Sequence, residues 1–333
     1  MKAIVYLGRE QMKLQDVPDL EPGEGRVLLR VAACGICGSD MHGYHGHDPR
    51  RVPPMIMGHE AAGIVIGGAL DGRRVALNPF LNCGSCTACL SGAPQLCEGQ
   101  RNIGLPPNAG AFAELVAVPE RNLEPIPDTM PFTTAALCEP LAVAVHAVAI
   151  GMRALARPLS TARIAVFGGG AIGLAMALVL IAEGARQVHL AETNPARRDT
   201  ANAASDRILP FAPEDAPEPG SFDLLLDAVG AVATREMAFR LARRGGVIVH
   251  SGLLPGTEGV DVRALTLREL SFLGAYCYSV ADFRQAMALL DARALGPLDW
   301  VEARALADGV ASFADIDAGR VAAAKIVLTT GME

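Results

Sequence analysis

The sequence has little that would suit a nucleic acid or a membrane. Its 29 lysine and arginine residues are outnumbered by 36 aspartate and glutamate residues, which gives a net charge of −7. An acidic chain without a basic, aromatic-interleaved patch is a poor partner for nucleic acid or an anionic membrane. The first residues read as a strand rather than a signal-peptide core. The run Ala171 to Ala182 is shorter than the roughly 20 apolar residues that span a bilayer. We therefore expect a cytoplasmic protein with a small-molecule partner.

The length of the chain favours two domains, because 333 residues are too many for one small core. In residues 1–143, Gly- and Pro-rich segments separate short alternating strands such as Val27–Val31 and Gly63–Ile66, which predicts an irregular β-rich domain. Residues 144–278 alternate strands with helices, which predicts an α/β fold with a doubly wound parallel sheet. Residues 279–333 have one amphipathic helix at Asp282–Leu290. They end in the strand-like Lys325–Leu328, which we expect to return to the first domain.

The elements of the α/β region can be predicted one by one from its apolar runs. A pair of glycines, Gly245-Gly246, follows Arg243-Arg244 and predicts the stop of a helix and a turn. The expected strands are Ile164–Phe167, Val188–Ala191, Leu224–Asp227, Gly246–His250 and Leu270–Ala275, and the expected helices are Ala171–Glu183 and Ala233–Arg243.

A dinucleotide fingerprint opens the first of these helices. The letters GGGAIG at Gly168–Gly173 fit G-x-G-x-x-G and follow the strand directly, so a pyrophosphate would lie at the helix N-terminus. Glu192 stands nineteen residues beyond Gly173, where an acid binds ribose hydroxyls and repels a 2′-phosphate, which favours NAD. Arg197 and Arg198 could instead bind that phosphate. The predicted cofactor-binding residues are Gly168, Gly170, Ala171, Ile172, Gly173, Glu192 and Arg197.

Four cysteines within fifteen residues predict a closed metal site. Cys83, Cys86, Cys89 and Cys97 form a C-x2-C-x2-C-x7-C run punctuated by glycine and proline, and four thiolates can enclose one soft divalent ion. With no open position, such a zinc ion would be structural. The spacing of the first three cysteines also suits an iron–sulfur cluster, but the fourth cysteine comes after seven residues rather than three and no proline follows it. Eight cysteines in a chain expected in a reducing compartment point to thiolate chemistry rather than disulfides.

A second ligand set mixes sulfur, nitrogen and oxygen. Cys37, His59 and Glu60 together resemble the ligands of a catalytic zinc that keeps one position open. Cys34 and Cys37 could also be read as a C-x-x-C redox pair, but Gly35 and Gly38 predict a flexible turn rather than a helix N-terminus. We therefore interpret Cys37 as a ligand and Cys34 as a packing neighbour.

An isolated acid and several basic side chains complete the candidate residues. Glu139 lies among apolar residues, and a zinc ion would provide the partner that a buried acid needs. His42 lies near the second ligand set, although loop histidines are usually only solvated. Arg50 and Arg51 could bind a sugar phosphate, but we interpret them as a solvated loop pair.

These motifs together resemble the zinc-dependent medium-chain dehydrogenases. The resemblance rests on GICGSDMH at Gly35–His42, GHE at Gly58–Glu60, the cysteine quartet and VFGGGAIG at Val166–Gly173, and it extends over nearly the whole chain. Glu139-Pro140-Leu141 is similar to the sorbitol (polyol) dehydrogenase branch. The resemblance implies a GroES-like catalytic domain beside a Rossmann domain, an active site between them, two zinc ions per subunit, and a homodimer or homotetramer.

Site roles follow from the same resemblance. Cys37 and His59 would bind the catalytic zinc, with Glu60 and Glu139 as exchanging or supporting carboxylates. Ser39 would relay the substrate proton, His42 would pass it to solvent, and Asp40 would orient the ligand histidine. Zinc would act as a Lewis acid on the substrate hydroxyl, and NAD would accept the hydride. The residues thus predicted as catalytic are Ser39, His42, Cys37, His59 and Glu60.

One departure leaves the substrate open. Some polyol dehydrogenases have a substrate-binding arginine where Cys277 stands in this sequence, so the sugar-binding details are not transferred. The expected activity is oxidation of a polyol to a ketose. Other activities on the same scaffold would be L-threonine or simple secondary-alcohol oxidation. A catalytically idle nucleotide-binding protein or a zinc-free reductase should lack zinc ligands that are present here.

Overall fold

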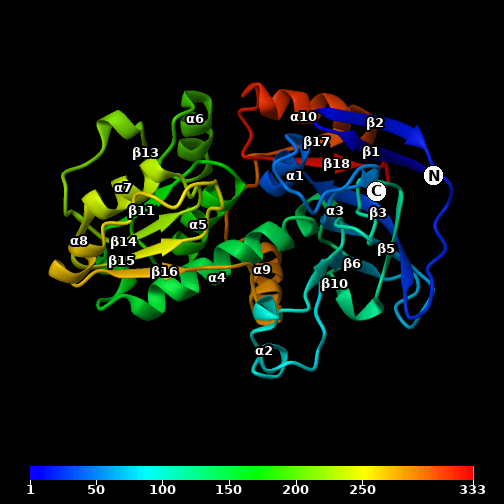
Figure 1. The fold of residues 1–333 in the computed structure, drawn as a ribbon, viewed down its shortest axis with the longest axis horizontal. Helices are drawn as coiled ribbons and strands as arrows, with labels where there is room; N and C mark the ends of the chain where they lie inside the picture. The colour runs from blue at the N-terminus through cyan, green and yellow to red at the C-terminus, as the bar shows by residue number, and fades with distance from the viewer. Residues whose placement is uncertain (333) are drawn as a thin grey trace. The chain divides into compact units, whose positions relative to one another are not determined.

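The computed structural model describes residues 1–332, which form two compact units (Figure 1). The first unit comprises Met1–Glu139, Ala286–Ala292 and Val301–Met332, and the second comprises Pro140–Gln285 and Arg293–Trp300. The α-helices are α1 (Gly38–Tyr44), α2 (Thr87–Leu90), α3 (Phe132–Ala135), α4 (Cys138–Ala154), α5 (Ala171–Ala182), α6 (Pro195–Ala204), α7 (Val232–Leu241), α8 (Val262–Leu267), α9 (Val280–Asp291) and α10 (Gly309–Asp317).

The first unit is built from β-sheets. Its largest sheet has the strand order β10-β6-β5-β3-β18-β17, with β9 also paired to β3, beside a sheet β2-β1-β4 and a pair β7-β8. The strands are β1 (Lys2–Gly8), β2 (Gln11–Asp16), β3 (Val27–Gly35), β4 (Met55–Ile56), β5 (Glu60–Ile66), β6 (Arg74–Leu77), β7 (Phe80–Leu81), β8 (Arg101–Asn102), β9 (Leu115–Val118), β10 (Leu123–Pro125), β17 (Val301–Ala305) and β18 (Lys325–Thr329).

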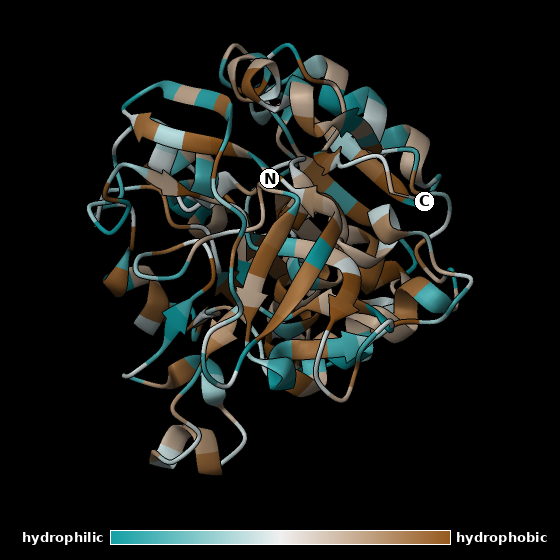
Figure 2. Cartoon of the chain, turned by 90° about the vertical axis from the view of Figure 1, so that its right-hand side faces the viewer, coloured by the Kyte–Doolittle hydropathy of each residue, from teal (hydrophilic) through white to brown (hydrophobic). Residues whose placement is uncertain are grey.

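The two ends of the chain share the core of this unit. Strand β18 pairs antiparallel with β3, with Val327 opposite Gly35, which confirms that the last strand returns to the first part of the chain. Phe313 on α10 packs edge-on against Phe112, with ring centroids 5.7 Å apart, and both side chains are fully buried. Figure 2 shows that strands near the N-terminus are mainly hydrophobic. Burial of these apolar faces holds the sheet together.

The second unit is a six-stranded parallel sheet with the order β13-β12-β11-β14-β15-β16. Every neighbouring pair in it is parallel, so each connection is a crossover, and the predicted doubly wound sheet is confirmed. The order reverses between β11 and β14. Its strands are β11 (Ile164–Phe167), β12 (Val188–Ala191), β13 (Ile208–Phe211), β14 (Phe222–Asp227), β15 (Ala242–His250) and β16 (Ser271–Gly274).

Two element predictions were wrong. Helix α7 ends at Leu241, and Arg243 already belongs to strand β15, because Asp223 on the neighbouring strand forms an ion pair with it. Gly245, with φ +70°, therefore lies at an irregularity of the strand rather than in the predicted turn after a helix. The C-terminal region also contains a second helix, α10, and a strand, β17, where we predicted one helix.

The helical stretch Phe132–Ala154 has the length and apolar character of a membrane span. However, 72% of its most apolar window is buried inside the protein. Burial of this kind is what a core helix shows, so the stretch needs no bilayer to cover its apolar side chains.

A histidine inside the second unit makes its stability depend on pH. Burial, and then the charge of Arg163, lowers the pKa of His189 on β12 from 6.5 to about 4. The neutral ring is therefore favoured in the folded state. Its contribution to stability is complete above the unfolded pKa of 6.5 and is lost as the pH falls towards 4.

We expect His189→Leu to reduce this acid sensitivity. In urea unfolding, the free energy of unfolding of the wild-type protein should fall by on the order of 1 kcal/mol more than that of the variant between pH 7.5 and pH 5. The difference is small because solvent screens part of the effect of burial on a partly buried ring. Equal losses in the two proteins would show that His189 does not titrate on unfolding.

Candidate active site

The first candidate ligand, Cys37, lies where strand β3 leads into helix α1. Cys37 is the N-cap residue, and its backbone N–H donates to Asp40 Oδ2 at 3.0 Å. The prediction of a flexible turn at Gly35 and Gly38 was therefore wrong, because Gly38 begins a helix. The reason for Gly35 is space: a Cβ there would lie 2.0 Å from Glu60 Oε2.

The other two donors come from the start of strand β5. Gly58, with φ +96°, turns the chain just before His59 and Glu60. The donor atoms of Cys37, His59 and Glu60 all lie within 4.8 Å of one another. A thiolate, an imidazole and a carboxylate in one cluster suit zinc, and three protein donors leave a fourth position for substrate.

The charges around His59 attract a cation. Burial by itself would lower the pKa of His59. The negative charges of Asp40, Cys37 and Glu139 outweigh burial and raise this pKa to about 10. A bound zinc ion would satisfy the same anions in place of a proton. Glu139, buried in the first turn of α4, lies outside the three-residue cluster but acts on His59 through its charge.

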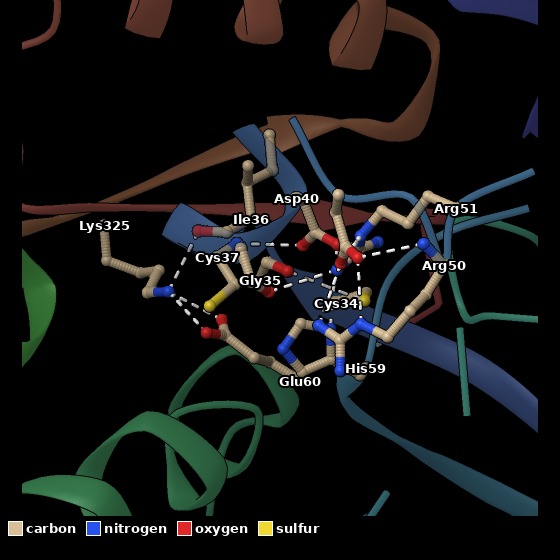
Figure 3. A network of polar contacts seen from close by, with 12 residues as sticks. Cys34, Gly35, Ile36, Cys37, Asp40, Arg50, Arg51, His59, Glu60 and Lys325 are labelled. Atoms are coloured by element: carbon tan, nitrogen blue, oxygen red, sulfur yellow. Dashed lines mark hydrogen bonds and ion pairs between the residues drawn. The ribbon is translucent and has the colours of Figure 1, made fainter. Parts of the chain in front are cut away.

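Sequence reasoning missed Lys325, which lies against the ligand cluster (Figure 3). Its ammonium donates to both oxygens of Glu60 at 2.7 Å and to the Ile36 carbonyl at 2.9 Å. Burial acts to lower the pKa of Lys325, but Glu60 and Cys37 raise it overall, so the side chain stays charged. The signal was available: Lys325 begins an apolar strand, and lysine is rarely buried unless it is paired.

Arginine 51 also differs from its prediction. Arg50 is an exposed side chain paired with Asp48, as a solvated loop residue should be. The Arg51 side chain is only 4% exposed and forms an ion pair with the fully buried Asp40 at 3.0 Å. The loop brings Arg51 back over α1, so reading the two residues as a solvated pair was wrong for Arg51.

The predicted proton relay lies on helix α1. Ser39 and His42 are three residues apart, so they share one face of the helix. Burial, followed by the charge of His47, lowers the pKa of His42 below 6.5, which leaves a neutral imidazole able to accept a proton. Cys34 is buried and burial raises its pKa well above the usual range, which suits a packing neighbour rather than a redox partner.

The cysteine quartet has the geometry of a single-ion site. The sulfur of Cys83 lies 3.9 Å from that of Cys89 and 3.5 Å from that of Cys97, and Cys86 lies 3.5 Å from Cys89. A tetrahedron of thiolates about 2.3 Å from zinc has edges of about 3.8 Å. All four thiols are free, and disulfide sulfurs would lie about 2.05 Å apart. Backbone N–H groups of Ser85 and Cys86 lower the pKa of Cys83 to about 5, as a thiolate ligand requires.

The glycine motif forms a cradle between β11 and α5. Gly168 has φ +98°, and a Cβ at Gly173 would lie 1.8 Å from the Gly168 carbonyl oxygen. Gly170 caps α5, and a Cβ there would meet open space, which is where a pyrophosphate could approach the backbone. Ala171 and Ile172 form the first turn of the helix.

Glu192 follows β12 and is tied to this cradle. One carboxylate oxygen accepts from Gly169 N at 2.7 Å, and the other accepts from Asn194 N at 2.7 Å. Arg197 lies half-buried on α6, whereas Arg198 donates to the carbonyls of Glu192 and Thr193. The acid is thus fixed beside the glycine motif, and Arg198 is already engaged with backbone oxygens.

A second pair at the carboxyl end of the sheet also escaped prediction. His250 ends β15, and its Nδ1 lies 3.2 Å from Oδ2 of Asp227, which ends β14. Burial acts to raise the pKa of Asp227. Hydrogen bonds from His250 and from Gly230 N outweigh burial and lower it, so the carboxylate stays ionised. Ligands of such sheets bind beyond the carboxyl ends of the strands, the edge that carries this pair.

Comparison with known proteins agrees with this geometry. The alcohol dehydrogenase GroES-like domain family matches residues 23–128, and the zinc-binding dehydrogenase family matches residues 171–292. Sorbitol dehydrogenase of Bacillus subtilis is 32% identical over 297 residues, which cover 84% of this chain and 83% of that protein. The chain belongs to the zinc-dependent medium-chain dehydrogenase family.

Further relatives of this dehydrogenase differ in substrate and cofactor. L-threonine 3-dehydrogenase of Rhizobium etli is also 32% identical, over 83% of each chain. A zinc-binding dehydrogenase of Sinorhizobium meliloti, solved with NADP, has a TM-score of 0.86 at 29% identity and covers 98% of each chain. The predicted fold class, a GroES-like domain and a Rossmann domain, is confirmed. The dehydrogenase is an oxidoreductase whose cofactors are zinc and a nicotinamide dinucleotide.

Proposed function

We propose that this dehydrogenase oxidises a secondary hydroxyl of a polyol to a ketone, with NAD⁺ as hydride acceptor. The observation that carries the proposal is the cluster of Cys37, His59 and Glu60, which has mixed donors and an open fourth position. The similarity to a sorbitol dehydrogenase, and the buried Glu139 in Glu-Pro-Leu, favour polyols as the substrate class.

Each of the candidate site residues has a separate role in the proposed reaction. Cys37 and His59 would hold the catalytic zinc, with Glu60 and Glu139 as nearby carboxylates, and Cys83, Cys86, Cys89 and Cys97 would hold the structural zinc. When bound, zinc supplies a Lewis acid for the substrate hydroxyl, and the dinucleotide accepts the hydride. Ser39 accepts the hydroxyl proton and His42 releases it to solvent, so the alcohol loses one hydride and one proton in total.

The preference for NAD is assigned to Glu192. Its carboxylate is buried beside the glycine motif, where the 2′-phosphate of NADP would meet a fixed negative charge. We expect Glu192→Ala to lower kcat/KM for NAD⁺ by about 10- to 100-fold, which corresponds to the loss of one or two charged hydrogen bonds. The value of kcat/KM for NADP⁺ should fall by a smaller factor. Steady-state rates with each cofactor give the ratio of kcat/KM for NAD⁺ to kcat/KM for NADP⁺ in the wild type and in the variant. An unchanged ratio in the variant would remove Glu192 from cofactor selection.

The substrate class is tested with a panel of alcohols. Zinc-replete enzyme and NAD⁺ are mixed with polyols, sugar-alcohol phosphates, L-threonine or simple secondary alcohols, and NADH absorbance is followed. Turnover of a polyol series supports the proposal, and its stereochemical pattern identifies the carbon oxidised. If only L-threonine or simple alcohols were oxidised, the proposed substrate class would be wrong, but the proposed zinc- and NAD-dependent oxidation would stand. No turnover with both zinc ions bound would favour an idle nucleotide-binding protein.

We also propose that the enzyme is a cytoplasmic homodimer or homotetramer without nucleic-acid or membrane partners. Its eight free cysteines suit a reducing compartment. Strand β16 is an end strand of the parallel sheet, and an unpaired strand edge can pair with a second copy of the chain. Light scattering of the purified enzyme measures its oligomeric state, and a monomer would contradict the assembly.

A further inference from the structure

We propose that Arg51 is a positioning residue for the proton relay, and this inference rests on the proposed function. Arg51 is buried, although the sequence predicted a solvated side chain. One guanidinium nitrogen donates to Asp40 Oδ1 at 3.0 Å, and another donates to Ser39 Oγ at 3.2 Å. The side chain thus connects the relay hydroxyl to the carboxylate that lies beside the ligand histidine.

The direction of the Ser39 bond follows from the chemistry of arginine. A guanidinium only donates hydrogen bonds and keeps its proton at any working pH, so Ser39 Oγ must be the acceptor. One lone pair of the hydroxyl is then occupied, while its second lone pair and its own proton remain. A relay needs both of these, because it accepts one proton and donates another. Arg51 therefore fixes the hydroxyl without using its relay capacity.

Asp40 extends the same network towards the ligands. Its Oδ2 accepts from Cys37 N at 3.0 Å, and its Oδ1 lies 3.7 Å from His59 Nδ1. The fully buried Asp40 needs a cation, and Arg51 provides one. Asp40 and Arg51 lie beside Cys37 and His59 (Figure 3). Because Arg51 also donates to Ser39 Oγ, the position of Ser39 is tied to the position of both candidate ligands.

The surrounding chain has room for this one side chain. A Cβ at Gly43 would lie 2.2 Å from Arg51 Cδ, so the glycine on α1 allows the arginine to cross the helix. Arg51 Nε also lies 3.4 Å from Oδ2 of Asp48, which precedes Arg51 by three residues. The guanidinium therefore hydrogen-bonds to Asp40 and Ser39 and lies within ion-pair distance of Asp48, and its planar fork fixes the angle between the two hydrogen bonds.

The test compares two Arg→Lys substitutions at neighbouring positions. Arg51→Lys keeps a cation for the buried Asp40 and so protects the fold, but it replaces the two separate guanidinium nitrogens on Asp40 and Ser39 by one flexible ammonium, so Ser39 is no longer held in a fixed position. Arg50→Lys is the matched control, because Arg50 is exposed and contacts Asp48. Each variant is assayed with the best alcohol of the panel for kcat, KM, solvent isotope effect, zinc content and Tm. Ser39→Ala and the double variant Ser39→Ala/Arg51→Lys complete the set.

We expect Arg51→Lys to lower kcat about 10-fold, a part of the 10²–10⁴ that positioned proton transfer supplies, with little change in KM or zinc content. Its solvent isotope effect should rise, because proton transfer becomes slower. The double variant should be no slower than Ser39→Ala, since Arg51 acts through Ser39. Arg50→Lys should match the wild type.

Three results would overturn the inference. Arg51→Lys could behave like Arg50→Lys, its loss could add in full to that of Ser39→Ala, or it could lose zinc with an unchanged isotope effect. The third result would make Arg51 a support of the metal site alone. A wild-type enzyme that oxidises no alcohol would instead refute the proposed function, and this inference with it.

Discussion

Replacing Cys37 with serine or His59 with alanine is expected to abolish NADH formation while leaving the fold intact. Either change removes a donor from the only mixed-donor cluster of three or more ligands found within residues 1–332. Loss of a Lewis acid removes several kcal/mol of transition-state stabilisation, so kcat/KM should fall by about 10³-fold or more. Metal analysis should find zinc reduced from two ions to one per chain, because the cysteine quartet is untouched.

The fold should survive these changes for a physical reason. Asp40, the carboxylate nearest to His59, keeps its ion pair with Arg51 when the imidazole is removed. Cys34→Ala is the matched control for Cys37, since it removes a buried thiol three residues earlier that lies outside the cluster. The control should retain most of its activity. Near wild-type turnover in both ligand variants would disprove the zinc mechanism.

Replacing Lys325 with methionine is expected to produce the largest loss of stability among the changes considered. The Lys325 side chain is 2% exposed, and its ammonium lies 2.7 Å from the carboxylate of the fully buried Glu60. Removing one partner leaves the other charge unpaired in the interior, which typically costs about 3–5 kcal/mol. Urea unfolding of the chelated protein measures this cost without a contribution from bound metal.

Two further variants separate the buried charge from the substitution itself. The double variant Glu60→Gln/Lys325→Met removes both charges and should recover most of the lost stability, because it leaves no unpaired ion. Lys2→Met makes the same change at an exposed lysine paired with Asp16, and it should alter the stability little. If Lys325→Met unfolded at the wild-type urea concentration, the pair would have no net role in stability.

Most of the site could be predicted because its motifs are local. The spacing of Cys83, Cys86, Cys89 and Cys97 brings four sulfurs together within one loop. The sequence spacing alone therefore predicts that these four side chains lie close to one another. The glycine motif is equally local, since the steric needs of Gly168 and Gly173 arise within one strand–helix turn. Alternating strands and helices likewise predicted the parallel sheet, because the period of apolar residues reports which faces are buried.

Errors arose where a distant contact overrides a local preference. Gly35 and Gly38 look like a flexible turn, but Glu60 across the sheet requires the space at Gly35, and Asp40 caps the helix that begins at Gly38. The end of helix α7 was placed too late, because Arg243 is drawn into strand β15 by Asp223. Glu60 and Asp223 lie on other elements, whereas Asp40 belongs to the helix that it caps.

The sequence by itself determined which residues are candidates for the chemistry of this protein, namely two sets of metal-ligand side chains and a glycine motif followed by an acid. The cysteine quartet and the glycine motif depend on residues close together along the chain, whereas Cys37 meets His59 and Glu60 through the pairing of strands β3 and β5. Only the tertiary structure decided the charges that support them. Lys325 meets Glu60 across 265 positions, and Arg51 turns inward to Asp40 and Ser39. Whether a long basic side chain is solvated or buried depends on which carboxylates lie next to it in the folded protein. Because those carboxylates belong to other elements of the fold, the spacing of residues in the sequence does not predict these contacts.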